Sequence, residues 1–259
     1  LIFVVKIKNN MRVCILGSGL TTLTLAKALV NQKIFVDIIS KNKKYKINYS
    51  RTIGISKSNY EYFKRNIINI EKIIWKLKKI EIYSDNLKKE KILNFENKEN
   101  QLFSIIKIHH LYDVLNKSLL KNKYFNKIIF EKKNSIKFDN YNLIINTDYN
   151  STFTKKYFSK KIEKIYNSTA YTTIINHETI SNDTAIQIFT KLGPLAFLPF
   201  SQNKTSIVYS VDKSKSINKK QIIQLIKQYN SKYKIKKIDK INFFDLKFFV
   251  LRSYFNKNI

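Results

Sequence analysis

MRVCILGSGLTTLTLAKALVNQKIFVDIIS, residues 11–40, decides the fold of this chain. The stretch opens with a short apolar run, turns at Gly17-Ser18-Gly19, and continues as a helical pattern whose apolar face ends at Leu29. A second apolar run then leads to Ser40. The order of strand, glycine turn, helix and strand predicts a βαβ unit, and therefore a Rossmann-like α/β domain.

The glycine turn predicts that this unit binds a dinucleotide. Gly17 can adopt backbone angles that a residue with a Cβ cannot, and Gly19 lets the main chain approach a pyrophosphate. We expect the phosphates at the helix N-terminus, beside Ser18, Leu20 and Thr21, where unpaired N–H groups meet the positive end of the helix dipole.

Two positions differ from the full dinucleotide-binding pattern. Thr22 stands where a third glycine is usual, and predicts slightly looser packing of helix on strand. Ser40 stands where an acidic residue usually binds the ribose, and can form a weaker hydrogen bond to it. A βαβ unit that binds nothing is the alternative, but the flanking strand and helix favour dinucleotide binding.

The composition is strongly basic. The chain of 259 residues carries a formal charge of +31, which by itself would suggest a nucleic-acid partner or an anionic membrane surface. The lysines are dispersed, however, and Lys, Asn and Ile are abundant from end to end. This pattern favours a solvated surface over a nucleic-acid groove, and leaves attraction to a membrane surface open.

The few cysteines and histidines, and the lack of long apolar runs, argue against disulfides, metal sites and membrane-spanning segments. Cys14 is the only cysteine and lies inside the first apolar run, so we expect a buried thiol and no disulfide. With three histidines in the chain, no metal site is expected. No apolar run is long enough to span a bilayer, which predicts a cytoplasmic protein. Met11 is the only methionine, so residues 1–10 are interpreted as upstream translation.

The remainder of the chain predicts a second, β-rich region. Strand-like runs at 80–83 and 91–95 predict a hairpin inserted into the nucleotide domain. Ser58, with Glu61 three residues later, predicts the start of a helix that ends near 68. Further strands are predicted at 169–176, 185–190, 193–200 and 206–211, and a helix at 216–229.

Four stretches, in this order, resemble the FAD-dependent aromatic-ring hydroxylases, and specifically their ubiquinone-biosynthesis branch. They are the glycine turn with Ala26, the RTIGIS segment at 51–56, the strand and polar turn at 142–151, and the region 177–211 with its GPLAFLP segment. The last of these is the most specific to the branch.

The resemblance implies a domain organisation. An FAD-binding domain would comprise 11–75 and 100–165, and a mostly antiparallel substrate-binding sheet would comprise 76–99 and 166–250. The fold class is therefore α/β: a Rossmann-like FAD/NAD(P)-binding domain with an inserted β-sheet domain. The family's later Gly-Asp motif is expected beyond residue 259, so a C-terminal segment of the FAD domain is predicted to be missing.

The resemblance also implies which residues bind the cofactor. Gly17, Ser18 and Gly19 would hold the FAD pyrophosphate, Arg51 would contact the flavin nucleotide, and the family's Asp-Gly motif maps to a degenerate turn at Asp148. NAD(P)H would reduce the FAD, and one oxygen atom of O₂ would enter a phenolic ring. No residue is assigned as a catalytic acid or base.

The implied substrate is a polyprenylated phenol or quinone precursor. The wall of its pocket is predicted at Leu195, Phe197 and Pro199, which alternate along one strand; ordinary sheet core is the alternative for these side chains. Such a lipid substrate implies peripheral association with the inner face of a membrane and contact with other ubiquinone-biosynthesis proteins. Two rival interpretations are a reductase-type Rossmann flavoenzyme and a truncated, non-catalytic relative or basic binding protein.

Overall fold

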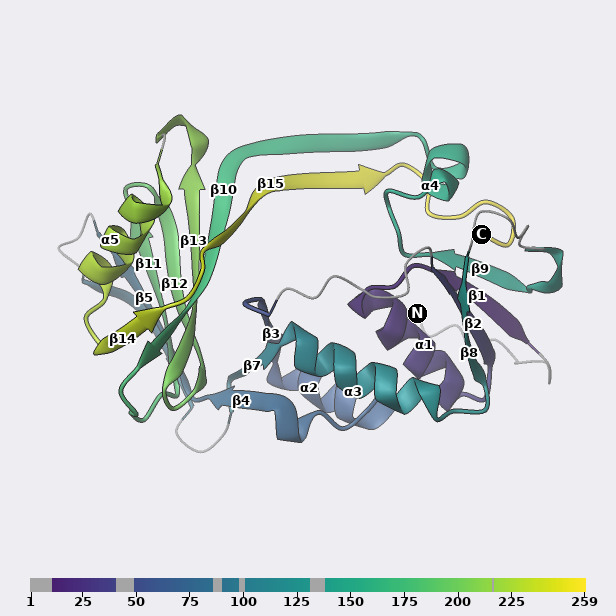
Figure 1. Cartoon of the computed structure of the whole chain (residues 1–259), viewed down its shortest axis with the longest axis horizontal. Coiled ribbons are helices and arrows are strands. Elements are labelled where there is room, and N and C mark those ends of the chain that lie inside the picture. The colour runs from purple at the N-terminus through teal and green to yellow at the C-terminus, as the bar shows by residue number, and fades with distance from the viewer. Residues whose placement is uncertain (1–10, 41–48, 86–89, 98–100, 131–137, 216) are drawn as a thin grey trace.

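A computed structural model describes residues 11–40, 49–85, 90–97, 101–130, 138–215 and 217–259. A parallel sheet lies at one end of the molecule and an eight-stranded sheet at the other, with a three-stranded sheet between them (Figure 1). The predicted α/β fold class, a parallel sheet combined with a mostly antiparallel one, is confirmed. Within the described residues, no helix has the length and apolar character needed to cross a membrane.

The parallel sheet has the order β8-β2-β1-β9. Residues 11–40 form the predicted unit of strand, helix and strand, with the glycine turn between β1 and α1. The elements of this half are β1 (Arg12–Leu16), α1 (Leu20–Asn31), β2 (Phe35–Ser40), α3 (Ile108–Leu120), β8 (Phe125–Ile129), η2 (Phe138–Asn140), β9 (Leu143–Asn146) and α4 (Thr152–Tyr157).

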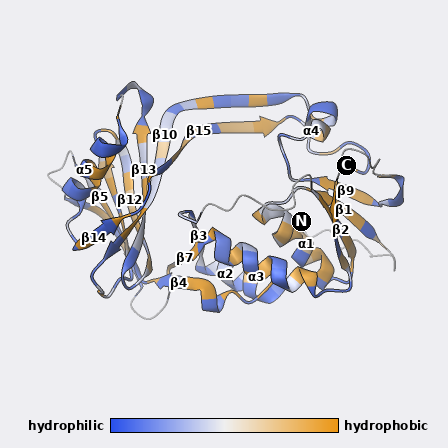
Figure 2. Cartoon of the chain, viewed as in Figure 1, coloured by the Kyte–Doolittle hydropathy of each residue, from blue (hydrophilic) through white to orange (hydrophobic). Residues whose placement is uncertain are grey.

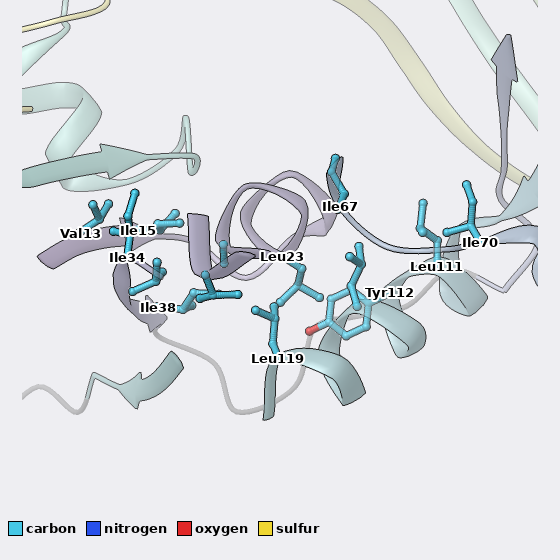
Figure 3. Packing of buried hydrophobic residues seen from close by; sticks show 14 of the residues in the cluster. Val13, Ile15, Leu23, Ile34, Ile38, Ile67, Ile70, Leu111, Tyr112 and Leu119 are labelled. Carbon is cyan, nitrogen blue, oxygen red and sulfur yellow. The ribbon is translucent and has the colours of Figure 1, made fainter. Parts of the chain in front are cut away.

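The main core of this half lies between β1, β2 and the helices α1 and α3. Val13 and Ile15 project from β1 toward Leu23 of α1, and Leu111 and Leu119 come from α3 (Figure 3). Each fully buried side chain of this kind contributes about 1.5–3 kcal/mol relative to exposure. Because side chains alternate along a strand, Cys14 points to the opposite face, where it is fully buried as expected. Burial raises the pKa of the Cys14 thiol to about 12.

The three-stranded sheet has the order β3-β7-β4 and is antiparallel. Its elements are β3 (Thr52–Ser56), α2 (Lys57–Asn66), η1 (Glu71–Ile73), β4 (Ile74–Leu77) and β7 (Phe103–Lys107). The predicted N-cap at Ser58 is wrong, because Ser56 caps α2 by accepting a hydrogen bond from the Asn59 N–H at 3.2 Å. Ser58 instead lies in the first turn, with its hydroxyl 3.0 Å from that of Ser56.

The eight-stranded sheet has the order β14-β10-β13-β12-β11-β5-β6, and β15 also pairs with β10. β5 and β11 are parallel, whereas the other pairs are antiparallel. The predicted hairpin is confirmed as β5 and β6. The elements are β5 (Lys79–Ser84), β6 (Lys91–Glu96), β10 (Lys161–His177), β11 (Thr184–Thr190), β12 (Gly193–Ser201), β13 (Lys204–Asp212), η3 (Lys213–Lys215), α5 (Lys219–Tyr229), β14 (Ile235–Ile238) and β15 (Asn242–Leu251).

Helix α5 covers one face of the eight-stranded sheet. It begins at Lys219 rather than at 216, because the Asn218 side chain caps it by accepting a hydrogen bond from the Gln221 N–H at 3.0 Å. Ile222 and Ile226 of α5 are buried against the sheet. The other face of the sheet packs on β4 and β7 of the three-stranded sheet.

Strands β10 and β15 extend beyond the sheet as a two-stranded ribbon that reaches α4 (Figure 1). Apolar segments recur along this ribbon (Figure 2). Several of its large side chains are exposed, including Ile165 at 70 % and Phe248 at 47 %. Residues 161–165 do not alternate strictly, because Glu163 and Lys164 are adjacent charged residues, and the sequence pattern therefore did not reveal the first half of β10.

Candidate cofactor-binding site

The turn after β1 has the conformation that the sequence predicts. Gly17 has φ +141°, in the region that residues with a Cβ rarely adopt, and its N–H donates to the Ile39 carbonyl at 3.0 Å. A Cβ at this position would collide with the hydroxyls of Thr147 and Thr22. The turn therefore requires glycine for both its backbone angles and its surroundings.

Two threonines, Thr22 and Thr147, stabilise the glycine turn by hydrogen bonds. The hydroxyls of Thr22 and Thr147 lie 2.7 Å apart, and the Thr147 hydroxyl donates to the Leu16 carbonyl at 2.9 Å. Thr22, at the third glycine position, is only 1 % exposed. Its hydroxyl bond attaches α1 to the end of β9. Sequence reasoning missed Thr147, although the parallel pairing of β1 with β9 places it beside Gly17.

The N-terminus of α1 has neither a capping side chain nor an acidic residue in its first turn. Gly19 is the N-cap, with φ −85° and ψ −176°, angles open to any residue. Leu20 packs against the core, whereas Thr21 is exposed. The free N–H groups and the helix dipole make this terminus a favourable position for an anion.

A cavity of about 300 Å³ opens beside the turn. It brings together Gly17, Ser18, Ser40 and Asp148, four of the residues that the sequence nominates, from the carboxyl ends of three neighbouring strands. Three phenylalanines that the sequence did not nominate also border it. The full lining is Leu16, Gly17, Ser18, Ile39, Ser40, Phe130, Phe138, Asp148, Ser151, Thr152 and Phe153.

A network of hydrogen bonds fixes the turn that carries Asp148. The Asp148 N–H donates to the Asn146 side chain at 3.1 Å, and the Asp148 carbonyl accepts from the Thr154 hydroxyl at 3.0 Å. Ser151 caps α4 by accepting from the Thr154 N–H at 3.2 Å. The Asp148 carboxylate accepts from the Asn150 N–H at 3.1 Å, which holds it at the cavity.

The buried carboxylate of β2 belongs to Asp37, which lies three residues before Ser40, the residue at the expected ribose position. Asp37, 3 % exposed, accepts from the Arg12 guanidinium at 2.8 Å and from the Tyr141 hydroxyl at 2.7 Å. Burial and the Asp37 charge raise the pKa of Tyr141. Because both partners already bind this carboxylate, its role is to join β2 to the segment that precedes β9.

Arg51 lies outside this cavity. Its guanidinium is 5.2 Å from the centre of the Phe244 ring on β15, and its side chain is exposed. The structure therefore places Arg51 between β3 and the long ribbon, and does not bring it together with the glycine turn.

The residues of β12 that were predicted to form a pocket wall lie in the core between the eight-stranded sheet and α5. Leu195 and Phe197 are 0 % and 2 % exposed and pack in the cluster that contains Ile222 of α5, so the core alternative holds for them. Pro199 is buried and follows them in the alternation. The strand's other face carries Leu198, which packs toward the three-stranded sheet. Because side chains alternate along a strand, β12 contributes to a core on each face of the sheet, and Leu195 and Phe197 lie on the face that α5 covers.

Comparison with known proteins identifies the fold. No family model matches the sequence, and no curated protein matches it. Among solved structures, p-nitrophenol 4-monooxygenase PnpA from Pseudomonas putida DLL-E4 is similar with a TM-score of 0.74 at 11 % identity, over 96 % of this chain and 71 % of that one. The chain shares its fold with this monooxygenase.

Two further solved structures agree with this assignment of fold. The tetrameric form of 2-methyl-3-hydroxypyridine-5-carboxylic acid oxygenase is similar with a TM-score of 0.71 at 11 % identity, over 97 % of this chain and 74 % of that one. PqsL from Pseudomonas aeruginosa, a probable FAD-dependent monooxygenase, gives a TM-score of 0.66 at 11 % identity, over 85 % of this chain and 67 % of that one.

The cavity fits the adenosine diphosphate part of FAD. A dinucleotide needs a main-chain turn without side chains at the pyrophosphate. Gly17 lines the cavity, and Gly19, the N-cap of α1, follows in the same turn without itself lining the cavity. It also needs a polar group at the end of the second strand, where Ser40 lines the cavity. Apolar rings such as Phe130 and Phe138 suit the faces of an adenine.

Proposed function

We propose that this chain is an FAD-dependent monooxygenase that uses NAD(P)H and O₂ to hydroxylate a polyprenylated phenol in ubiquinone biosynthesis. The observation that carries the flavin part of the proposal is the cavity beside Gly17, because it joins the glycine turn, Ser40 and Asp148 in the position that a dinucleotide requires. The substrate class rests on the resemblance of the 177–211 region to the ubiquinone-biosynthesis branch.

In this proposal each group at the cavity has a defined task. The N–H groups at the start of α1 would bind the pyrophosphate, since they are uncapped and no acidic side chain competes for them. Ser40 would bind the ribose, and the Asp148 turn would close the opposite side. Arg51 would approach the flavin nucleotide from β3, where its side chain is exposed and therefore accessible.

Bound FAD would supply the chemistry, by accepting a hydride from NAD(P)H and transferring an oxygen atom of O₂ to the substrate. The chain would position the phenolic ring on the sheet face opposite α5, beside the part of that face that packs on β4 and β7. On that face, Ala196 and Thr172 both pair with Val208 of β13. The Thr172 hydroxyl is buried and has no hydrogen-bond partner in the described part of the chain, so it is suited to bind a phenolic oxygen.

Two surface features support a lipid substrate. The formal charge of +31 favours approach to an anionic membrane surface, and exposed apolar side chains such as Ile165 and Phe248 line the ribbon. A protein of this kind would be cytoplasmic and would bind peripherally to the inner face of the membrane, close to other ubiquinone-biosynthesis proteins.

The proposal is tested by measuring O₂ uptake by the FAD-loaded protein with NADH or NADPH and a prenylated phenol. The expected result is substrate-dependent O₂ consumption with a product that is heavier by one oxygen atom. Oxidation of the nicotinamide cofactor without O₂ uptake would show a reductase instead. A folded protein that takes up no flavin would support the non-catalytic interpretation.

A further inference from the structure

A second cavity, of about 330 Å³, lies between the three-stranded sheet and the hairpin of β12 and β13. It shares no lining residue with the cofactor cavity. Its lining contains two lysines and a histidine but no carboxylate. The lining residues are Ile73, Ile105, Lys107, His110, Phe200, Ser201, Asn203 and Lys204.

The two lysines come from different sheets and converge on this cavity. Lys107 ends β7 and Lys204 begins β13, and the Lys107 ammonium lies 4.6 Å from the centre of the Phe200 ring. Neither lysine forms an ion pair within the described residues, although ten such pairs involve other side chains. Burial and the nearby Lys204 charge lower the pKa of Lys107. Positive charge is therefore concentrated here without an internal counter-charge.

The start of α3 adds to this positive potential. The helix has 13 residues, begins directly after Lys107, and has no capping side chain and no acidic residue in its first turn. His110, in that first turn, lines the cavity. Burial and the Lys107 charge lower the pKa of His110, and the Asp113 charge opposes them. In either protonation state the imidazole carries an N–H that can donate a hydrogen bond. The side chains of Lys107 and His110 therefore lie at the positive end of the α3 dipole.

We propose that this cavity binds the phosphate group of a small phosphorylated molecule. Two ammonium groups and the positive end of the α3 dipole match a compact dianion in charge, and the ammonium and imidazole groups supply the hydrogen-bond donors. The first N–H of α3 is not among these donors, because Ile108 donates it to the Arg51 carbonyl at 3.1 Å. The apolar wall formed by Ile73 and Ile105 leaves room for an organic part beside the phosphate. Inorganic phosphate and a sugar phosphate would both offer a phosphate group to this cavity. Titration with each of them separately distinguishes the two kinds of ligand.

The test is calorimetric titration of the 259-residue protein with inorganic phosphate and, separately, with ribose 5-phosphate. Because ribose 5-phosphate carries a phosphate and a ribose, which the cofactor cavity could also bind, the site is assigned by the variants and not by the probe alone. The variants are Lys107→Met and Lys204→Met, which keep the aliphatic stem. The control is Lys191→Met, which removes the same charge from the exposed hairpin turn between β11 and β12.

We expect each cavity variant to weaken binding at least 10-fold, and the Lys191 variant to leave it unchanged. Tighter binding of ribose 5-phosphate than of inorganic phosphate would identify a phosphorylated organic ligand, and equal binding would identify a site for the free anion. The proposal is overturned if all three variants bind alike, because the attraction would then come from the overall charge, or if neither probe binds. Circular dichroism verifies folding, and two independent cavity variants keep the result interpretable if one of them misfolds.

Discussion

Replacing Gly19 by valine separates binding of the cofactor from folding. The backbone at Gly19 is extended, with φ −85°, so valine fits the conformation and the free energy of unfolding should change by about 1 kcal/mol or less. A valine side chain would, however, stand between the α1 N-terminus and an approaching pyrophosphate. Loss of one charge-assisted hydrogen bond costs about 1.5–3 kcal/mol. The dissociation constant of FAD should therefore rise about 10- to 150-fold.

The assay is quenching of flavin fluorescence on titration of the protein into FAD, together with thermal unfolding of the same samples. Thr24→Val is the matched control, since it introduces the same side chain into α1 beyond the first turn, away from the helix N-terminus that would bind the pyrophosphate. Equal FAD affinity for Gly19→Val and Thr24→Val would refute the position that we assign to the pyrophosphate.

Three further predictions concern the support of the site and the second sheet. Gly17→Ala should destabilise the fold by about 1–3 kcal/mol or more, measured by urea unfolding, because of its positive φ and the collision with two threonines. Thr147→Val should cost about 1–3 kcal/mol in the same assay by leaving the buried Thr22 hydroxyl without a partner, and an unchanged midpoint would show that the bond is dispensable. Burial raises the pKa of Glu81, but hydrogen bonds from Lys91, Tyr83 and Lys79 outweigh this effect and lower the pKa to about 2. Its contribution to stability is therefore present above pH 4.5 and is lost as the pH falls toward 2, so Glu81→Gln should flatten the acid limb of a stability profile, and an unaltered limb would contradict this.

The cofactor half was predictable from the sequence because its signals are local. The turn needs glycine at position 17, and the apolar periods on either side show a strand and a helix. Ser40 could be nominated because it ends the second apolar strand of the βαβ unit, and Asp148 because the resemblance maps the family's Asp-Gly motif to its turn. The carboxyl ends of parallel strands meet at one edge of a sheet, which brings the two residues together.

The remaining features depend on contacts between distant segments. Thr147 supports the turn only because β9 pairs with β1, a contact across 125 residues that no local pattern contains. The two faces of β12 are both apolar, so the sequence could not show that Leu195 and Phe197 face α5. Lys107 and Lys204 belong to different sheets, and only the packing of those sheets brings them to one cavity.

The central claim is that the cavity beside the glycine turn holds FAD. The most direct measurement is a crystal structure of the chain grown with FAD. The account predicts density for the pyrophosphate at the N-terminus of α1, for the ribose at Ser40 and for the adenine beside Phe130 and Phe138. An FAD bound elsewhere, or a cavity that stays free of FAD under saturating conditions, would contradict it.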